Sequence, residues 1–246
     1  MATDSTKRPY GTSLEFVESG FMACWQNAKE LLSASQKLID SGLHAPALSL
    51  SVLALEELGK FFAIDGLLYA RQDDHKAAEF LKAGRSHSTK LILLELFPLL
   101  LGNLSRADPR YGKDSRYNLA LAASIQDLKE AENAVMAELG EGSFLALDRW
   151  KQQGFYAGAA EREGRFVAPS EAVNPSLAKA VHRLAWRAVT TLDFVLKGGN
   201  LEQYIQNARS VRAALTEAQH RELEQQGHKL FATIFVDRDD GPPVVN

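Results

Sequence analysis

The sequence predicts an all-α protein, a bundle of about six or seven helices with a small irregular or β-hairpin insert around 140–175. Two observations favour the bundle. Apolar residues recur at helical spacing through most of the chain, and the stretch 45–69 is apolar around most of its circumference. A helix of that kind is buried on nearly all sides. Between 140 and 175 glycine and aromatic residues become frequent, which is typical of turns and short strands.

The composition is that of an ordinary globular protein. Of 246 residues, 46% are hydrophobic and 24% are charged, enough to bury a sizeable core. The net charge of −3 excludes a protein that is basic overall, so any binding of nucleic acid needs a local basic patch. The single cysteine, Cys24, excludes an intramolecular disulfide and a cysteine-cluster zinc site.

No membrane partner is expected. The first residues are polar and lack the apolar segment of a signal peptide. The apolar run 91–101 is too short to span a bilayer and contains Glu95 and Pro98. These features predict a cytoplasmic protein. Residues 13–236 are expected to form a single domain, with flexible tails at 1–12 and 237–246.

The first half of the chain predicts four helices. One is expected over 13–40, where a Ser-Gly pair ends it, and the central helix follows over 45–69. A shorter helix is expected over 73–81. The next is capped by a serine and runs over 86–103, with a bend at Pro98.

The second half predicts further helices on either side of the insert. Within the insert, the segments 154–157 and 165–167 flank a turn-prone Glu-Gly pair, and we expect them to form a hairpin or an ordered loop over the bundle. The predicted helices are 118–139, 176–196, 202–215 and 217–235.

The central helix carries charges at its midpoint. At about 100° per residue, Ser49, Glu56 and Lys60 fall in one narrow stripe, with Glu57 at its edge. Charges in a buried helix are costly unless they are paired. Two interpretations stay open: an ion pair between Glu56 and Lys60 on the one solvated strip of the helix, or a polar site inside the core.

A second polar pair points inward from the next helix. His87 and Lys90 lie on the same side as its apolar residues, within about a quarter of the circumference. A lone histidine in such a place is often a satisfied structural group. The presence of a second inward polar pair in the same chain favours a shared site.

Basic and aromatic residues alternate in the predicted loop 106–117. Such residues bind single-stranded nucleic acid, with charges on phosphates and rings under bases. The alternative is a solvated loop in which Asp108 and Asp114 balance the charge. The candidate RNA- or phosphate-binding residues are Arg85, Arg106, Arg110, Tyr111, Lys113 and Arg116.

Three motifs follow one another along the chain: Glu-Glu-x-Gly-Lys at 56–60, His-x-x-Lys at 87–90, and Lys-x-x-Gly-Phe-Tyr at 151–156. Together they resemble the AbiV family of abortive-infection proteins, over about residues 31–175. That family is placed in the HEPN superfamily of all-α proteins, many of which are metal-independent ribonucleases acting as dimers. The resemblance implies an HEPN-like bundle, a homodimer, RNA as a partner and a phage-encoded or host protein as a trigger. It implies no metal and no cofactor.

RNA cleavage without a metal needs a base, an acid and cations for the charge on phosphorus. His87 can transfer protons near neutral pH, and a partly buried glutamate with a raised pKa can be the second proton-transfer group. The candidate catalytic residues are therefore Glu56, Glu57, Lys60, His87 and Lys90. Many catalytic HEPN proteins carry an arginine–histidine pair instead. Only Arg221 and His228 have a similar spacing, and we assign no catalysis to them.

Two other classes of function stay open. In a non-catalytic interaction or regulatory module, the same residues would form a buried network that fixes helix register. A carboxylate metal site on a bundle needs Glu-x-x-His pairs, and neither Glu56 nor Glu57 has a histidine three residues on. An open cleft holding His87 and Glu56 would favour the enzyme, and a dry, fully paired interior would favour the module.

Overall fold

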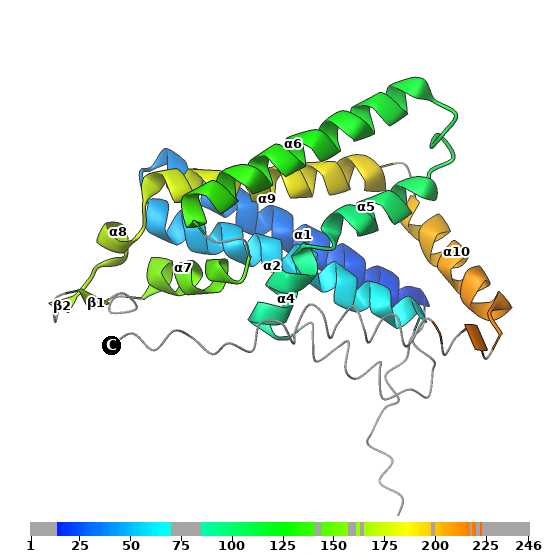
Figure 1. Ribbon diagram of the computed structural model, residues 1–246, viewed down its shortest axis with the longest axis horizontal. Helices are drawn as coiled ribbons and strands as arrows, with labels where there is room; N and C mark the ends of the chain where they lie inside the picture. The colour runs from blue at the N-terminus through cyan, green and yellow to red at the C-terminus, as the bar shows by residue number, and fades with distance from the viewer. Residues whose placement is uncertain are drawn as a thin grey trace, which may run out of the picture.

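The computed structural model describes residues 14–69, 85–140, 144–156, 161–162, 165–197, 200–216, 218–219 and 222. Most of these residues are helical, so the predicted all-α class is confirmed (Figure 1). The helix predicted over 73–81, most of the helix predicted over 217–235 and both predicted tails lie outside the described residues. The helices are α1 (Leu14–Asp40), α2 (His44–Tyr69), α4 (His87–Leu94), α5 (Phe97–Arg106), α6 (Ser115–Leu139), α7 (Ala146–Phe155), α8 (Pro169–Ala172), α9 (Pro175–Leu196) and α10 (Asn200–Ala214).

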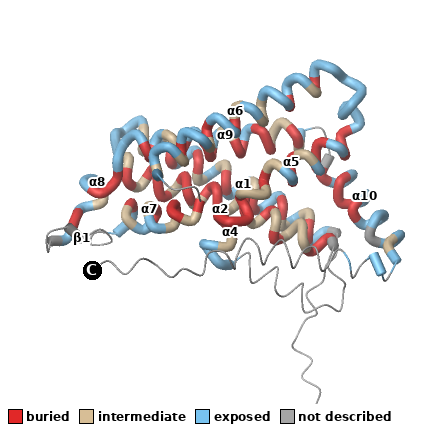
Figure 2. The backbone as a smooth tube through the Cα atoms, in the orientation of Figure 1, coloured by how far each residue is buried: buried red, intermediate tan, exposed pale blue. Residues whose placement is uncertain are grey.

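Helix α2 is the central element of the bundle. Helices α1, α9, α4 and α7 all pack against it, and buried backbone runs along most of its length (Figure 2). Many of its large apolar side chains, among them Leu48, Leu55, Leu58 and Phe61, are fully buried. A helix that is apolar on all sides is stable only when neighbours cover all sides, as they do here. The described residues from α1 to α10 share one hydrophobic core cluster.

The turn between α1 and α2 is set by a glycine. Gly42 has a φ of +75°, a backbone conformation that glycine adopts without strain. The N–H of Gly42 donates to the carbonyl of Ile39, and the N–H of Leu43 donates to the carbonyl of Leu38. This pair of bonds is a Schellman motif, which satisfies the last carbonyls of α1 and reverses the chain. The predicted end of the first helix is confirmed.

The helix predicted over 86–103 is two helices, α4 and α5, which meet at an angle of 59°. The break lies at Glu95 and Leu96, earlier than the bend predicted at Pro98. Pro98 has no N–H to donate to the carbonyl of Leu94, so the ladder fails on the N-terminal side of the proline. Pro98 instead lies in the first turn of α5. Among the described residues no single helix is long and apolar enough to span a membrane; α4 and α5 together meet that test by length and composition only.

The insert contains the predicted hairpin and also two helices that were not predicted, α7 and the four-residue α8. Strands β1 (Glu161–Arg162) and β2 (Arg165–Phe166) pair antiparallel, with Arg162 opposite Arg165. The prediction that 154–157 forms the first arm of the hairpin is wrong, because Gly154 and Phe155 lie in the last turn of α7. The buried residues of α7 do follow helical spacing. One of them is Lys151, however, and a lysine does not count toward an apolar pattern, so the pattern does not predict this helix.

Two glycines inside helices allow unusually close approach of backbones. A Cβ at Gly59 of α2 would lie 2.0 Å from the carbonyl oxygen of Lys90 on α4. A Cβ at Gly154 of α7 would lie 2.2 Å from Oγ of Ser49 and 2.5 Å from the carbonyl oxygen of Ala45, both on α2. No side chain fits at either distance. Helices α4 and α7 therefore reach α2 only because these positions are glycine.

We expect Gly59→Ala and Gly154→Ala each to lower the free energy of unfolding by about 1–3 kcal/mol or more, because the added methyl group must push two helices apart. Urea denaturation measures the loss. Gly102→Ala on α5 is the matched control, since its Cβ would have nothing within 4 Å. There the helix preference of alanine predicts equal or higher stability. Alanine at Gly59 and Gly154 that is tolerated as well as at Gly102 would contradict the close packing.

Candidate functional site

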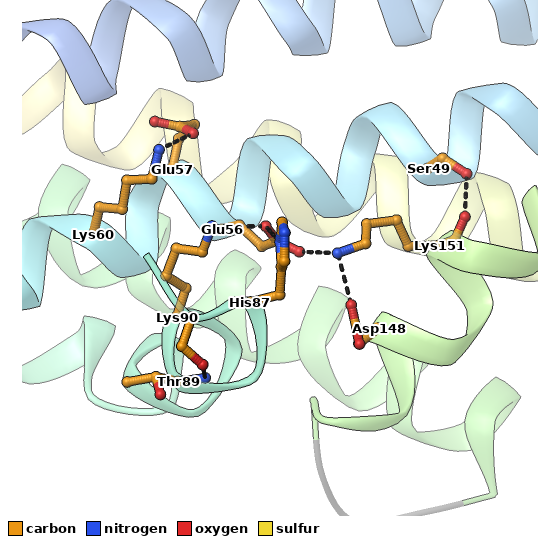
Figure 3. Close-up of polar contacts among 10 residues, drawn as sticks. Ser49, Glu56, Glu57, Lys60, His87, Thr89, Lys90, Asp148 and Lys151 are labelled. Carbon is orange, nitrogen blue, oxygen red and sulfur yellow. Dashed lines mark hydrogen bonds and ion pairs between the residues drawn. The ribbon is translucent and has the colours of Figure 1, made fainter. Parts of the chain in front are cut away.

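A buried carboxylate lies at the junction of α2, α4 and α7 (Figure 3). Glu56 of α2 is only 1% exposed. Its Oε1 lies 2.5 Å from Nζ of Lys151 on α7. Its Oε2 lies 2.5 Å from Nδ1 of His87 and 3.0 Å from Nζ of Lys90, both on α4. One carboxylate therefore joins three nitrogen groups from two neighbouring helices.

Both lysines of this cluster are removed from water. The side chains of Lys90 and Lys151 are 6% and 5% exposed. Lys151 Nζ also lies 2.6 Å from Oδ1 of Asp148, one turn earlier on α7. Two carboxylates and two ammonium groups thus balance in charge. Such balance is what allows ionised groups to remain in a core, because an unpaired buried charge is very costly.

The lysine on α7 is also held through its backbone. Oγ of Ser49 on α2 donates a hydrogen bond of 2.8 Å to the carbonyl oxygen of Lys151. Ser49 lies two turns before Glu56 on the same side of α2, as the predicted stripe implies. The position of Lys151 is therefore fixed at both ends, by Ser49 at its backbone and by Glu56 at its ammonium group.

His87 is the member of the cluster that reaches solvent. Its side chain is 52% exposed. Within the described part of the chain, the ring hydrogen-bonds only through Nδ1, to Glu56. A carboxylate on one ring nitrogen holds the ring in place and favours the tautomer with the proton on that nitrogen. Nε2 is then the nitrogen that can accept a proton from a ligand.

Of the five predicted catalytic residues, the structure brings three together, namely Glu56, His87 and Lys90. The other two, Glu57 and Lys60, form their own ion pair on α2 and do not join Glu56 (Figure 3). The ion pair between Glu56 and Lys60, one of the two interpretations of the stripe, is therefore not formed.

Besides its ion pair with Lys60, Glu57 lies close to the thiol of Cys24. Burial, together with the charge of Glu57, raises the pKa of the Cys24 thiol to about 11. The thiol is therefore protonated near neutral pH, and it is not a nucleophile at this site.

Two members of the cluster were not predicted as site residues. Lys151 belongs to the third motif but is not among the candidate site residues, and no motif includes Asp148. Both lie on α7, a helix that was not predicted. Lys151 follows Leu147 and precedes Gly154 at helical spacing, and all three are buried. A lysine at an inward position of an amphipathic helix is the pattern that could have identified it.

The basic loop between α5 and α6 is largely engaged with itself. The guanidinium of Arg110 binds the carboxylate of Asp108 through Nε and Nη2, at 2.6 to 3.2 Å, and lies 4.4 Å from the ring centroid of Tyr117. Arg106 donates to Asn103, and Asp114 caps α6. These contacts favour the solvated-loop interpretation. RNA binding by this loop stays a prediction.

The predicted RNA-binding residues are not gathered in one place. In Figure 1 the loop between α5 and α6 lies far from α4 and α7. Arg85, in contrast, is exposed and lies two residues before His87. The remaining predicted residues, Tyr111, Lys113 and Arg116, are exposed.

Three residues of the cluster offer donor atoms for a metal ion: Glu56, His87 and Asp148, whose atoms lie within 4.8 Å of one another. The ammonium group of Lys151 lies between the two carboxylates, at 2.5 Å from Glu56 and 2.6 Å from Asp148. It takes the place that a divalent cation would need. The residues present therefore do not fit a metal ion unless Lys151 moves away.

The all-α bundle is consistent with an HEPN-like fold. The chain matches the family model described as AbiV (HEPN_AbiV) over residues 16–190, well over half of its length. It therefore belongs to the AbiV family and is an abortive-infection protein of the HEPN type. Searches of curated proteins and of solved structures gave no significant match. The Arg221–His228 spacing lies outside both the matched and the described residues.

We expect Glu56→Gln to lower the free energy of unfolding by about 3–5 kcal/mol, because it leaves the buried ammonium group of Lys90 without a counter-charge and that of Lys151 with Asp148 alone. Lys151→Met is expected to cost less, since Glu56 keeps Lys90 and His87. Urea denaturation ranks the two variants. Lys197→Met, which breaks the exposed pair with Asp193, is the control and should change little. Equal stability of Glu56→Gln and wild type would mean that the carboxylate does not balance buried charge.

Proposed function

We propose that this protein is a metal-independent endoribonuclease toxin of anti-phage defence, in which His87 transfers protons. The observation that supports this most is the state of the imidazole. It is half exposed and held through Nδ1 by a buried carboxylate, and Nε2 has no hydrogen bond to any residue that the structure describes. A carboxylate–histidine pair of this kind is suited to general acid–base chemistry. The family match supports the role in abortive infection.

The proposed reaction uses few groups. Nε2 of His87 takes the proton of an RNA 2′-hydroxyl, and the 2′-oxygen attacks the adjacent phosphorus. The bond from phosphorus to the 5′-oxygen breaks, a 2′,3′-cyclic phosphate forms, and the leaving 5′-oxygen takes up the proton from the imidazolium. Glu56 stabilises that imidazolium. Arg85, exposed two residues before His87, is the cation available for the phosphate.

The sequence predicts Lys90 as a catalytic residue, but in this proposal neither Lys90 nor Lys151 contacts the RNA. Their ammonium groups contact Glu56 and are buried, so they are not placed to meet a phosphate in solvent. Their positive charges offset the cost of burying the carboxylate, and their contacts fix its position. They are positioning residues, and their loss should affect activity through Glu56 and His87.

His87→Asn tests the proposal, because asparagine can keep a hydrogen-bond donor near the position of Nδ1 but cannot transfer a proton. We expect RNA cleavage to fall by about 100-fold or more and growth arrest on induction to disappear, with the melting temperature nearly unchanged. Cleavage is measured on purified protein with EDTA present, and RNA ends are sequenced from induced cells with and without phage infection. Cyclic phosphate ends are the expected product.

His44→Asn provides a matched control, since His44 opens α2 outside the cluster. It should leave cleavage intact. Wild-type protein that neither cleaves RNA nor arrests growth under any of these conditions, including phage infection, would overturn the ribonuclease proposal. A large loss of stability in His87→Asn would then favour a structural role for the ring.

A second candidate is the non-catalytic module, and the burial of the cluster favours it. Glu56 is inaccessible and both of its oxygens are engaged, as expected for a network that fixes helix register. In this proposal the protein acts by binding a partner, such as a phage-encoded or host trigger. Cleavage assays separate the two, because a module has no activity for His87→Asn to remove.

We also propose a homodimer, on the strength of the family alone. In the apolar run 91–101, Leu91, Phe97 and Leu101 are buried within the chain itself and Leu99 is exposed, so most of the run is not free for an interface. Light scattering at micromolar concentration should give twice the 27.1 kDa mass of one chain. A mass of one chain at that concentration would contradict the dimer.

A further inference from the structure

A second polar cluster lies on nearly the opposite side of α2, where α2 meets α1 and α9. Oγ of Ser35 lies 2.8 Å from Oγ of Ser51 and 3.0 Å from Nδ1 of His182. The other ring nitrogen, Nε2, lies 2.8 Å from Oε1 of Gln36. Ser51 precedes Glu56 by five residues, which is about 140° around the helix. The two clusters share no residue.

This second cluster ends at an open groove of about 320 Å³. Trp186, on α9, is 48% exposed there, although tryptophan is a side chain that proteins usually cover. The groove is lined by Gln36, His182, Arg183, Trp186 and Arg187.

The amide of Gln36 is held in one orientation at the groove. Its Nε2 donates to Oδ1 of Asp40 at 2.8 Å, so Oε1 is the atom that faces His182. Burial lowers the pKa of His182, which keeps the ring neutral with its proton on Nε2, donated to Gln36. Within the described part of the chain the amide keeps one N–H and one lone pair of Oε1 unused. The groove therefore offers a fixed donor and a fixed acceptor.

Two arginines supply positive charge one helical turn apart on α9. Arg183 is exposed. Arg187 binds Asp127 through Nη1 at 2.9 Å, which leaves its other N–H groups available. Asp40 is the carboxylate nearest the amide of Gln36, and it is engaged by that amide. The arginine side of the groove therefore attracts an anionic group. The Gln36 side is suited to hydrogen bonds with an uncharged polar group of a ligand.

We propose that this groove binds a nucleotide, with the base stacked on Trp186, its edge at Gln36, and the phosphate on Arg183 and Arg187. Each part of the nucleotide would contact a suitable group of the protein. The base stacks on the indole ring, the edge of the base hydrogen-bonds to the amide, and the phosphate binds the guanidinium groups. An acidic peptide would use the arginines alone and leave the ring and the fixed amide without a role. The nucleotide belongs to an RNA strand or is a free mononucleotide, and the site does not depend on the activity proposed for His87.

Binding to the full chain tests this by calorimetry, with two probes. One is AMP, and the other is a 2′-O-methyl oligoadenylate of about eight nucleotides, which lacks the hydroxyl that the proposed cleavage needs. We expect at least one probe to bind, and Trp186→Ala to weaken it about fivefold or more. Trp186→Phe should recover part of the affinity, because it restores a stacking ring. Arg183→Ala should weaken binding and reduce its dependence on salt.

Arg149→Ala is the matched control, since Arg149 lies near a different tryptophan, Trp150, on α7. It should bind as wild type does. Preference for the oligonucleotide assigns the groove to RNA, and equal or better binding of AMP assigns it to a free nucleotide. Absence of binding of both probes at millimolar concentration overturns the proposal. Unchanged binding in both Trp186→Ala and Arg183→Ala also overturns it, as does binding of a polyglutamate peptide in place of both nucleotides.

Discussion

The ion pairs of Glu56 are the interaction on which the arrangement of α2, α4 and α7 depends. A lone carboxylate at this depth would cost several kcal/mol, and the pairing with Lys90 and Lys151 offsets that cost only when both ammonium groups arrive. They come from different helices, so one residue selects the placement of two neighbours. Gly59 and Gly154 allow those helices to come close enough. Each of the three motifs thus contributes a charged group to the cluster, and two of them also contribute a glycine.

Within this cluster, structure and chemistry fall on different residues. Glu56, Lys90 and Lys151 are buried and satisfied, which is the arrangement of a stabilising network. His87 is half exposed, so it contributes less to the stability of the core. Its hydrogen bond to the carboxylate nevertheless fixes the orientation of the ring. A change at Glu56 therefore disturbs the fold and any chemistry together. A change at His87 separates them, which is why the histidine is the more informative position.

The sequence predicted those features that depend on neighbours close along the chain. The end of α1 at a glycine, the burial of α2 and the inward position of Lys90 on α4 all follow from local spacing. His87 was predicted to face inward as well, but it is half exposed because it lies in the first turn of α4. Contacts that depend on the rest of the fold were missed. Helix α7 was not predicted because its inward side includes a lysine, which is explained only once Glu56 is seen across from it. Helical spacing allows Lys60 to pair with Glu57, three residues before it, or with Glu56, four residues before it. In the structure it pairs with Glu57.

The polar groups of α2 also fix the rotation of the helix about its own axis. Because apolar residues cover nearly all sides of α2, hydrophobic burial changes little when the helix turns, and apolar packing alone would allow several orientations. Ser49 and Glu56 are satisfied only toward α4 and α7, and Ser51 only toward α1 and α9. A rotation would leave buried hydroxyls and a charge without partners, at a cost of several kcal/mol. The same groups that make α2 look unsuited to a core are therefore the ones that give it a single orientation there, and they place one polar cluster on each side of it.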